Sequence, residues 1–166
     1  KAIDLNANFA ESYNNLGNVF KERKNLNDAI ICYKDALAIN PNFAQALYNL
    51  GSCYKKNNQK EKALTFFERA WTLKPDMDFI LGDLLATLMG FCFWDDYHDL
   101  LNQTKLKILN NEKVIHPFNL LGLIDDPYIQ QKATKIFADH HYPENSNIPK
   151  IEPYNNHPKI RIGYFS

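Results

Sequence analysis

Five histidines are the residues of this 166-residue chain best suited to bind a metal or to transfer protons: His98, His116, His140, His141 and His157. Zinc sites space their ligands in recognisable patterns, for example two histidines four residues apart on one helix face. The histidines here follow no such pattern. We therefore interpret them as surface and linker residues, and we expect no metal site and no cofactor in this chain.

Two pairs of adjacent aspartates, Asp95-Asp96 and Asp125-Asp126, have side chains that could act as a general acid and base. An aspartate at a helix start has a simpler explanation, because its carboxylate accepts hydrogen bonds from free backbone amides. Pro127 supports this explanation, since proline favours the first position of a helix. We predict a helix that begins at Pro127 with Asp126 as its N-cap, and we expect no catalytic residue in this chain.

The three cysteines, Cys32, Cys53 and Cys92, are odd in number and widely spaced. They form no CxxC pair, so neither a zinc site nor a disulfide framework is indicated. We interpret them as small buried hydrophobic residues in a reducing compartment, which predicts a cytoplasmic protein.

The charges exclude two classes of partner. Nineteen basic and nineteen acidic side chains cancel, so no overall field attracts nucleic acid or anionic lipid. The longest apolar stretch, residues 77–91, contains two aspartates and is shorter than the roughly 20 residues that span a bilayer. We expect neither nucleic acid nor a membrane as a partner.

The elements that would position any functional residue are organised as an internal repeat. Residues 8–17 (Asn-Phe-Ala-Glu-Ser-Tyr-Asn-Asn-Leu-Gly) align with residues 42–51 (Asn-Phe-Ala-Gln-Ala-Leu-Tyr-Asn-Leu-Gly), an offset of 34 residues. The match continues to Pro41 and Pro75. A period of this length predicts stacked helical hairpins.

Each unit has the periodicity of two helices. We predict that the first helices begin at Asn8 and Asn42, each with the spacing of a capping box, and that the prolines end the second helices. Gly17 and Gly51 fall in the middle of the first helices, where glycine costs about 1 kcal/mol relative to alanine. That cost predicts a close approach of the second helix, which carries a small alanine, Ala29 in the first unit, at this level.

The sequence resembles the tetratricopeptide repeat in its order of a large apolar residue, Leu-Gly, an aromatic, Ala, an aromatic, Ala and Pro. The resemblance implies a right-handed superhelix whose first helices line a concave groove, and a protein- or peptide-binding role without chemistry. After Pro75 the pattern degenerates, with Leu85 at the glycine position and Tyr97 at the alanine position. We expect a degenerate capping repeat there.

One position of the first helix repeats a polar side chain: Asn15, Asn49 and, in the degenerate unit, Asp83. An amide offers both a donor and an acceptor, so a ladder of amides could bind an extended peptide backbone. Glu11 and Asn18 share this face. These five residues are our candidate peptide-binding site, although asparagine is also abundant elsewhere in the chain.

A rival use of the groove is a carboxylate clamp, the arrangement by which some tetratricopeptide co-chaperones bind an acidic C-terminal peptide. By analogy such a clamp needs cations near Glu11, Phe79 and Asp83. Two of these positions are acidic and would repel a peptide carboxylate. Lys21 and Lys55, near the helix ends, are interpreted as part of a solvated face.

Several short motifs follow the repeats in a fixed order. They are Phe-Cys-Phe-Trp-Asp-Asp-Tyr (residues 91–97), His-Pro-Phe-Asn-Leu-Leu-Gly-Leu-Ile-Asp-Asp-Pro (116–127) and Lys-Ile-Arg-Ile-Gly-Tyr-Phe-Ser (159–166). This order resembles the O-linked N-acetylglucosaminyltransferases, the tetratricopeptide glycosyltransferases that include the plant Spindly-type O-fucosyltransferases. Animal members have His after the connector proline, whereas Phe118 and Asn119 follow Pro117 here.

The second resemblance implies a parent enzyme that transfers a sugar, usually N-acetylglucosamine from UDP-N-acetylglucosamine, to Ser or Thr of proteins without a metal. The UDP-sugar donor and the catalytic residues of that family belong to two Rossmann-like halves beyond Ser166. A lone alternating strand at residues 159–166 would need a sheet to pair with. We therefore expect a fragment that is inactive by itself.

The expected fold class is all-α: a right-handed tetratricopeptide superhelix with a helical cap, ending in a lone strand of a truncated α/β domain. The predicted segments are the end of a preceding repeat (1–7), two repeats (8–41 and 42–75), a degenerate capping repeat (76–111), a helical connector (112–142), a Pro/Asn-rich linker (143–158) and the strand (159–166). The expected function is a substrate-recruiting arm of a protein O-glycosyltransferase that holds acceptor proteins in its groove. The alternative is a stand-alone tetratricopeptide adaptor for protein–protein interaction.

Overall fold

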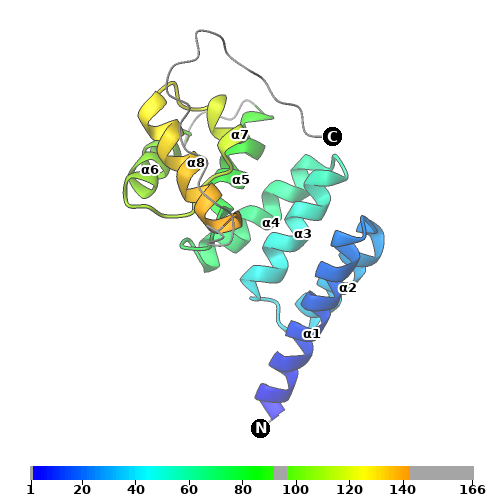
Figure 1. Ribbon diagram of the computed structural model, residues 1–166. Helices are drawn as coiled ribbons and strands as arrows, with labels where there is room; N and C mark the ends of the chain where they lie inside the picture. The colour runs from blue at the N-terminus through cyan, green and yellow to red at the C-terminus, as the bar shows by residue number, and fades with distance from the viewer. Residues whose placement is uncertain (1, 92–96, 143–166) are drawn as a thin grey trace, which may run out of the picture.

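The computed structural model describes residues 2–91 and 97–142 of the chain, with side chains from residue 8 onward. These residues form eight helices and no strand (Figure 1). The helices are α1 (Ala2–Glu22), α2 (Leu26–Ile39), α3 (Ala44–Lys56), α4 (Lys60–Leu73), α5 (Ile80–Met89), α6 (Tyr97–Leu109), α7 (Pro117–Leu121) and α8 (Pro127–His141). The all-helical prediction is confirmed for the described part. The expected linker and strand (143–166) and the motif around Trp94 lie outside the described residues.

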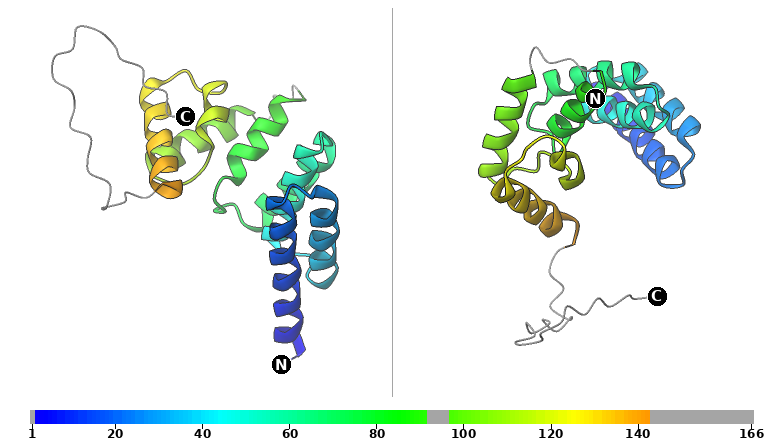
Figure 2. Two further views of the ribbon diagram at one scale, coloured as in Figure 1. Left: turned by 45° about the vertical axis from the view of Figure 1, so that its right-hand side comes forward. Right: turned by 90° about the horizontal axis from the view of Figure 1, so that it is seen from above.

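The first four helices form two hairpins, as the 34-residue period predicts. α1 packs on α2 and α3 packs on α4, while α2 contacts α3 and α4 contacts α5, so that each hairpin rests on the next. Viewed from above, the helices follow one another in a curve from α1 to α8 (Figure 2). A core between the hairpins includes Tyr33, Leu50 and Phe67, none of which is exposed to solvent.

The two glycines within the first helices do mark close contacts. A Cβ atom at Gly17 would lie 2.6 Å from the ring of Tyr33, and one at Gly51 would lie 2.9 Å from the ring of Phe67. The closest neighbour is therefore the aromatic ring of the second helix, rather than the alanine that the sequence suggested. In both hairpins the absence of a side chain lets that ring pack directly on the helix backbone.

The helix predicted to start at Asn8 begins earlier, which is a correction to the sequence analysis. α1 runs without a break from Ala2, so Asn8 is an interior residue and caps nothing. The equivalent segment before α3 is interrupted because Pro41 cannot continue a helix. The residue 34 positions before Pro41 is Ala7, a strong helix former, and nothing local stops the helix there.

The expected capping box before the third helix is absent as well. The N-cap of α3 is Phe43, and no side chain caps this helix end. Asn42 instead donates its backbone N–H to the Oδ1 atom of Asn40 (3.2 Å), which is a turn interaction. The start of α2 is capped by the side chain of Asn25.

The helices after the repeats form a second core that closes the array. Leu81 and Leu85 of α5 pack with Leu100 and Ile108 of α6, and the cluster extends to residues of α7 and α8. α5 is brought close to the segment after α6 at Gly82, where a Cβ atom would lie 2.6 Å from a side-chain atom of Ile115. The helical cap that the sequence predicted is thus present.

The last described helix starts as predicted. Asp126 is the N-cap of α8, and its Oδ1 atom accepts hydrogen bonds from the backbone N–H groups of Tyr128 (3.0 Å) and Ile129 (3.2 Å). Pro127 occupies the first turn. Ile129 and Ala133 of α8 are buried. Asp126 is therefore explained by local structure.

Candidate functional site

Two polar clusters join the first helices of successive hairpins. We call Asn14, Lys21 and Asn49 the first triad. The Nδ2 atom of Asn49 donates to the Oδ1 atom of Asn14 at 3.0 Å, and the Nζ atom of Lys21 donates to the Oδ1 atom of Asn49 at 3.0 Å. Both asparagines are buried, at 5 % and 3 % exposure. A buried amide with partners for its donor and its acceptor stabilises one register of α1 against α3.

The second triad repeats this arrangement one hairpin later. Its members are Tyr48, Lys55 and Asp83, each 34 residues after a member of the first triad. The Tyr48 hydroxyl donates to the Oδ2 atom of Asp83 at 2.7 Å, and the Lys55 Nζ atom lies 3.0 Å from the Oδ1 atom. The charged carboxylate of Asp83 stands at the position of the Asn49 amide, and hydrogen bonds to a charged group are stronger than those between neutral groups.

Burial alters the ionisation of two triad residues. The pKa of Tyr48 is raised well above its usual value, mainly by desolvation and then by the charge of Asp83. Tyr48 therefore remains a protonated hydrogen-bond donor at neutral pH. Desolvation also lowers the pKa of Lys21 from its ordinary 10.5. The expectation that Lys21 and Lys55 belong to a solvated face was wrong, because both bind a polar side chain of the next hairpin.

The three rungs of the expected amide ladder lie in different environments. Asn15 is exposed, Asn49 is buried within the first triad, and Asp83 is partly buried within the second. Asn49 thus differs from a rung that is free to bind peptide, since α1 covers it and supplies both of its observed partners. The burial follows from stacking, because this repeat position of a first helix faces the hairpin before it.

The other two candidate residues lie on α1. Glu11 is exposed, and Asn18 is half-buried with its Oδ1 atom accepting a hydrogen bond from the Tyr33 hydroxyl at 2.8 Å. Asn18 therefore also has a role in holding α1 to α2. Among the five candidates, Glu11 and Asn15 are the ones whose side chains are exposed on the face of the first helices.

A polar cavity of about 450 Å³ lies where this face meets the last helix. Gln45 and Tyr48 of α3, Phe79 and His140 contribute to its wall, together with Lys74, Asp76, Met77 and Asp78 of the turn before α5. Gln45 is exposed, in a position equivalent to Glu11. The cavity offers amide, carboxylate, ammonium and imidazole groups within one concave surface.

An aromatic stack adjoins this cavity through Phe79, which lines it. The rings of Phe79 and His116 are stacked with centroids 4.7 Å apart, and Phe137 and His141 of α8 lie against them. Phe79 adopts a left-handed backbone conformation (φ 64°), which is costly for a side chain of this size. Desolvation lowers the pKa of His116 from 6.5. Sequence reasoning missed this stack, because its members are distant in the chain.

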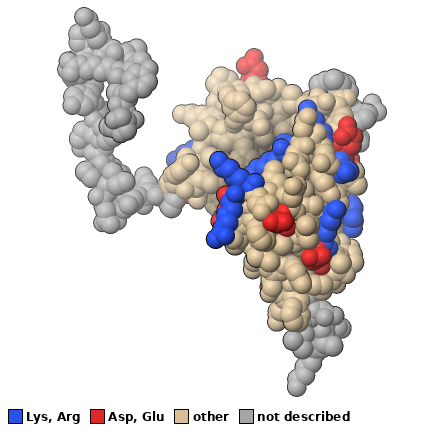
Figure 3. All heavy atoms as spheres, turned by 90° about the vertical axis from the view of Figure 1, so that its right-hand side faces the viewer, with Lys and Arg blue, Asp and Glu red and all other residues tan. Residues whose placement is uncertain are grey.

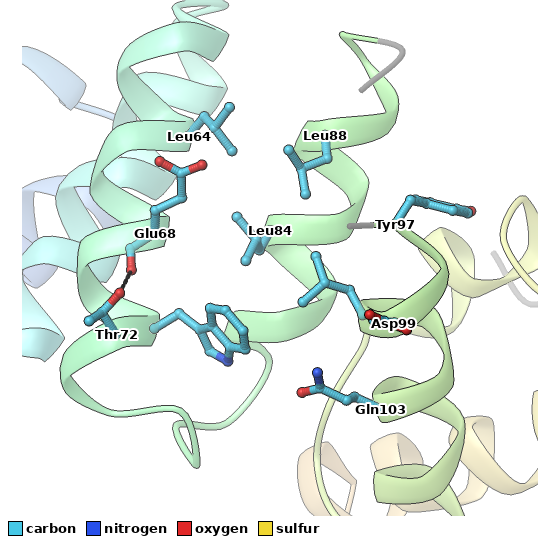
Figure 4. Close-up of a pocket in the computed structure, with 10 residues that line it drawn as sticks. Leu64, Glu68, Thr72, Leu84, Leu88, Tyr97, Asp99 and Gln103 are labelled. Carbon is cyan, nitrogen blue, oxygen red and sulfur yellow. Dashed lines mark hydrogen bonds between the residues drawn. The ribbon is translucent and has the colours of Figure 1, made fainter. Parts of the chain in front are cut away.

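A second cavity, of about 580 Å³, opens between α4, α5 and α6. Leu64, Leu84 and Leu88 are directed into it, and Glu68 and Asp99 lie near its edges (Figure 4). None of its lining residues belongs to either triad or lines the polar cavity. Its lining contains no residue that the sequence analysis selected as a binding residue.

Charges of both signs are mixed on the surface. Figure 3 shows a face on which Lys and Arg side chains gather near the middle, with Asp and Glu side chains among and beside them. In the part of the chain that the structure describes, no group of three or more His, Cys, Asp or Glu residues is arranged to hold a metal ion. Cys32 and Cys53 are buried free thiols, and Cys92 lies outside the described residues. None of the helices described is long and apolar enough to cross a bilayer.

Comparisons with known protein families identify the repeats. A family model described as TPR repeat matches residues 17–58, and one described as tetratricopeptide repeat matches residues 44–77. The second match begins at the first residue of α3, two residues after the boundary at 42 that the sequence analysis proposed. No curated protein matches the chain. The chain therefore contains tetratricopeptide repeats, which suggest a role in protein–protein interaction.

Proposed function

We propose that this chain binds an extended segment of a partner protein along the face formed by α1, α3 and α5. The observation that carries the proposal is the cavity beside Gln45, Tyr48 and His140, because it adjoins the first helices of tetratricopeptide repeats. The walls of the cavity supply hydrogen-bonding groups from Gln45, Tyr48 and Lys74 and from two aspartates. Such a surface suits a peptide backbone better than an apolar ligand.

In this proposal the exposed and the buried polar residues have different tasks. Glu11 and Gln45 contact the partner, and each hydrogen bond contributes about 0.5–1.5 kcal/mol. Asn49 and Asp83 act indirectly, because they fix the spacing of the helices that present the contacting residues. The candidate site of the sequence analysis is thereby divided into contact residues and positioning residues.

A photo-crosslinking amino acid at Gln45, compared with the same residue at Ile31, tests this proposal. Ile31 is 56 % exposed on α2, the second helix of its hairpin, and gives a matched control on another face. The proposal expects a partner polypeptide to be crosslinked at position 45 and not at 31. Equal crosslinking at both positions, or crosslinking at 31 alone, would refute the assigned face.

A second, finer proposal is that the partner is an acceptor protein of a glycosyltransferase to which this chain belongs. It is supported by the motif order from residue 91 to residue 166 and by the connector, in which Asp126 and Pro127 start α8. The parent enzyme would transfer N-acetylglucosamine from a UDP-sugar to Ser or Thr. The chain itself would supply no catalytic residue, and the whole protein would be cytoplasmic.

Glycosyl transfer by the full-length protein tests the second proposal. The assay supplies UDP-N-acetylglucosamine and acceptor proteins and measures incorporated sugar before and after Glu11→Ala with Gln45→Ala. The proposal expects activity in the parent protein and reduced use of protein acceptors by the double variant. Absence of transfer in the parent would favour the adaptor, whereas unchanged acceptor use would mean that these residues do not recruit acceptors.

A further inference from the structure

The first helix carries an apolar stripe that no other described residue covers. Tyr13, Leu16 and Val19 are 38 %, 45 % and 44 % exposed. Phe9, one turn earlier, is 56 % exposed. We call these four residues the α1 stripe. They recur every three or four residues, so they share one face of α1.

The second hairpin shows what covers such a stripe. The residues 34 positions after Tyr13, Leu16 and Val19 are Leu47, Leu50 and Cys53. All three have 0 % exposure. They pack against the preceding hairpin: Leu50 and Cys53 share a core with Ala29 and Tyr33 of α2, and Leu37 of α2 packs against the cluster that contains Leu47. The equivalent face of α1 therefore carries the apolar side chains of an interface with a preceding hairpin, but no described hairpin packs there.

The polar residues follow the same rule. Asn49 binds Lys21 and Asn14, which precede it by 28 and 35 residues, and Asp83 binds Lys55 and Tyr48 at the same two separations. Asn15 is the equivalent of Asn49 and Asp83, yet it is exposed and has no such partner among the described residues. The apolar and the polar observations are independent, and both indicate a missing neighbour on the same side of α1.

The start of α1 has the sequence of a turn between hairpins. Residues 2–9 (Ala-Ile-Asp-Leu-Asn-Ala-Asn-Phe) align with residues 36–43 (Ala-Leu-Ala-Ile-Asn-Pro-Asn-Phe), which end α2 and lead into α3. Ala7 in place of Pro41 allows residues 2–9 to be helical when nothing packs against the stripe. With a hairpin docked there, this segment can turn as residues 40–43 do, and α1 would then begin at Ala10, as α3 begins at Ala44.

We propose that the α1 stripe is the docking surface for one further helical hairpin of the same repeat type, joined ahead of α1. The first helix of that hairpin binds Asn15 through a lysine and, seven residues before it, an amide or hydroxyl side chain. The proposal favours a hairpin of the same chain over a second copy stacked head to tail, because α2, α4 and α6 already pack against α3, α5 and α8. This proposal does not depend on what the groove binds.

A tandem duplication of residues 10–43 in the full chain provides the test. In the duplicated chain, the first copies of Lys21 and Asn14 precede the second copy of Asn15 by 28 and 35 residues, as in the native triads. The proposal expects one cooperative thermal transition with a midpoint raised by at least about 5 °C. It also expects amide hydrogen exchange in the second copy of α1 to slow to the level of α3. Two separate transitions with an unchanged main midpoint would overturn it.

Two pairs of substitutions distinguish docking from a general effect of added length. Leu16→Glu in the second copy should remove the gain in midpoint, but should alter the parent chain little, since Leu16 is 45 % exposed there. Ile31→Glu in the second copy, at an exposed site on α2, should change neither chain. Lys21→Met in the first copy should lower the midpoint more than Lys24→Met, which replaces an exposed lysine. Equal effects within these pairs would overturn the proposal.

Sedimentation of the parent chain tests whether a second copy of the chain covers the α1 stripe. The proposal expects a monomer, with the same mass for the parent and for Leu16→Glu. A dimer that Leu16→Glu dissociates would make the stripe a self-association surface and would contradict the proposal.

Discussion

Replacement of Asp83 by alanine should reveal how much the second triad contributes to stability. The Asp83 carboxylate accepts a 2.7 Å hydrogen bond from Tyr48 and pairs with Lys55 at 3.0 Å. A hydrogen bond to a charged group contributes about 1.5–3 kcal/mol, and loss of the acceptor leaves a partly buried hydroxyl unpaired. The Lys55 side chain is 33 % exposed, so its pairing adds at most about 1 kcal/mol. We expect Asp83→Ala to lower the free energy of unfolding by about 2–3 kcal/mol.

Urea denaturation measures this loss, and Asp78→Ala is its control. Asp78 pairs with Lys113 at 3.2 Å in the turn before α5, but its side chain is 54 % exposed, so we expect a loss of at most about 1 kcal/mol. The double variant Tyr48→Phe with Asp83→Ala should lose less than the sum of the single losses, because both remove the same hydrogen bond. Equal losses for Asp83→Ala and Asp78→Ala, or additive losses in the cycle, would refute the assignment of Asp83 as a positioning residue.

Three other predictions concern packing and ionisation. Gly82→Ala should destabilise the chain by more than about 2 kcal/mol in urea denaturation, because the added Cβ atom would lie 2.7 Å from the Cα atom of Ile115. Gly122→Ala is the control and should be neutral or stabilising, because no atom lies within 4 Å of its added Cβ atom. Burial lowers the pKa of His116 from 6.5, so the neutral imidazole stabilises the fold fully above about pH 6.5, and this stabilisation is lost as the pH falls. The thermal midpoint should therefore fall between pH 7 and pH 5, and it should fall less in His116→Phe. Burial raises the pKa of the Cys53 thiol, so alkylation at pH 7.5 should require unfolding, and rapid labelling of the folded chain would contradict this.

The repeated part of the fold could be predicted because its contacts are local and recur. The 34-residue offset predicted the two hairpins, and Gly17 and Gly51 predicted close helix contact. The start of α8 was also predictable, since the aspartate–proline pair is a local signal for a helix start. A physical reason links these successes, namely that each signal and the structure it specifies lie within one or two helices.

The candidate site was predicted only in part, because its key contacts join different hairpins. Asn49 was identified as a repeating polar residue, but its burial depends on α1, which covers it. Lys21 and Lys55 recur with the same offset, and this recurrence was the available signal for the triads. The stack of Phe79 with His116 had no sequence signal, because the two residues are brought together by the fold of the cap.

Hydrogen exchange of the chain bound to its crosslinked partner segment tests the central claim most directly, namely that the first helices form the protein-binding face. The account predicts slower amide exchange on binding in α3 and in residues 10–18 of α1, with little change in α2. Protection confined to α2 or to the cavity between α4 and α6 would contradict it.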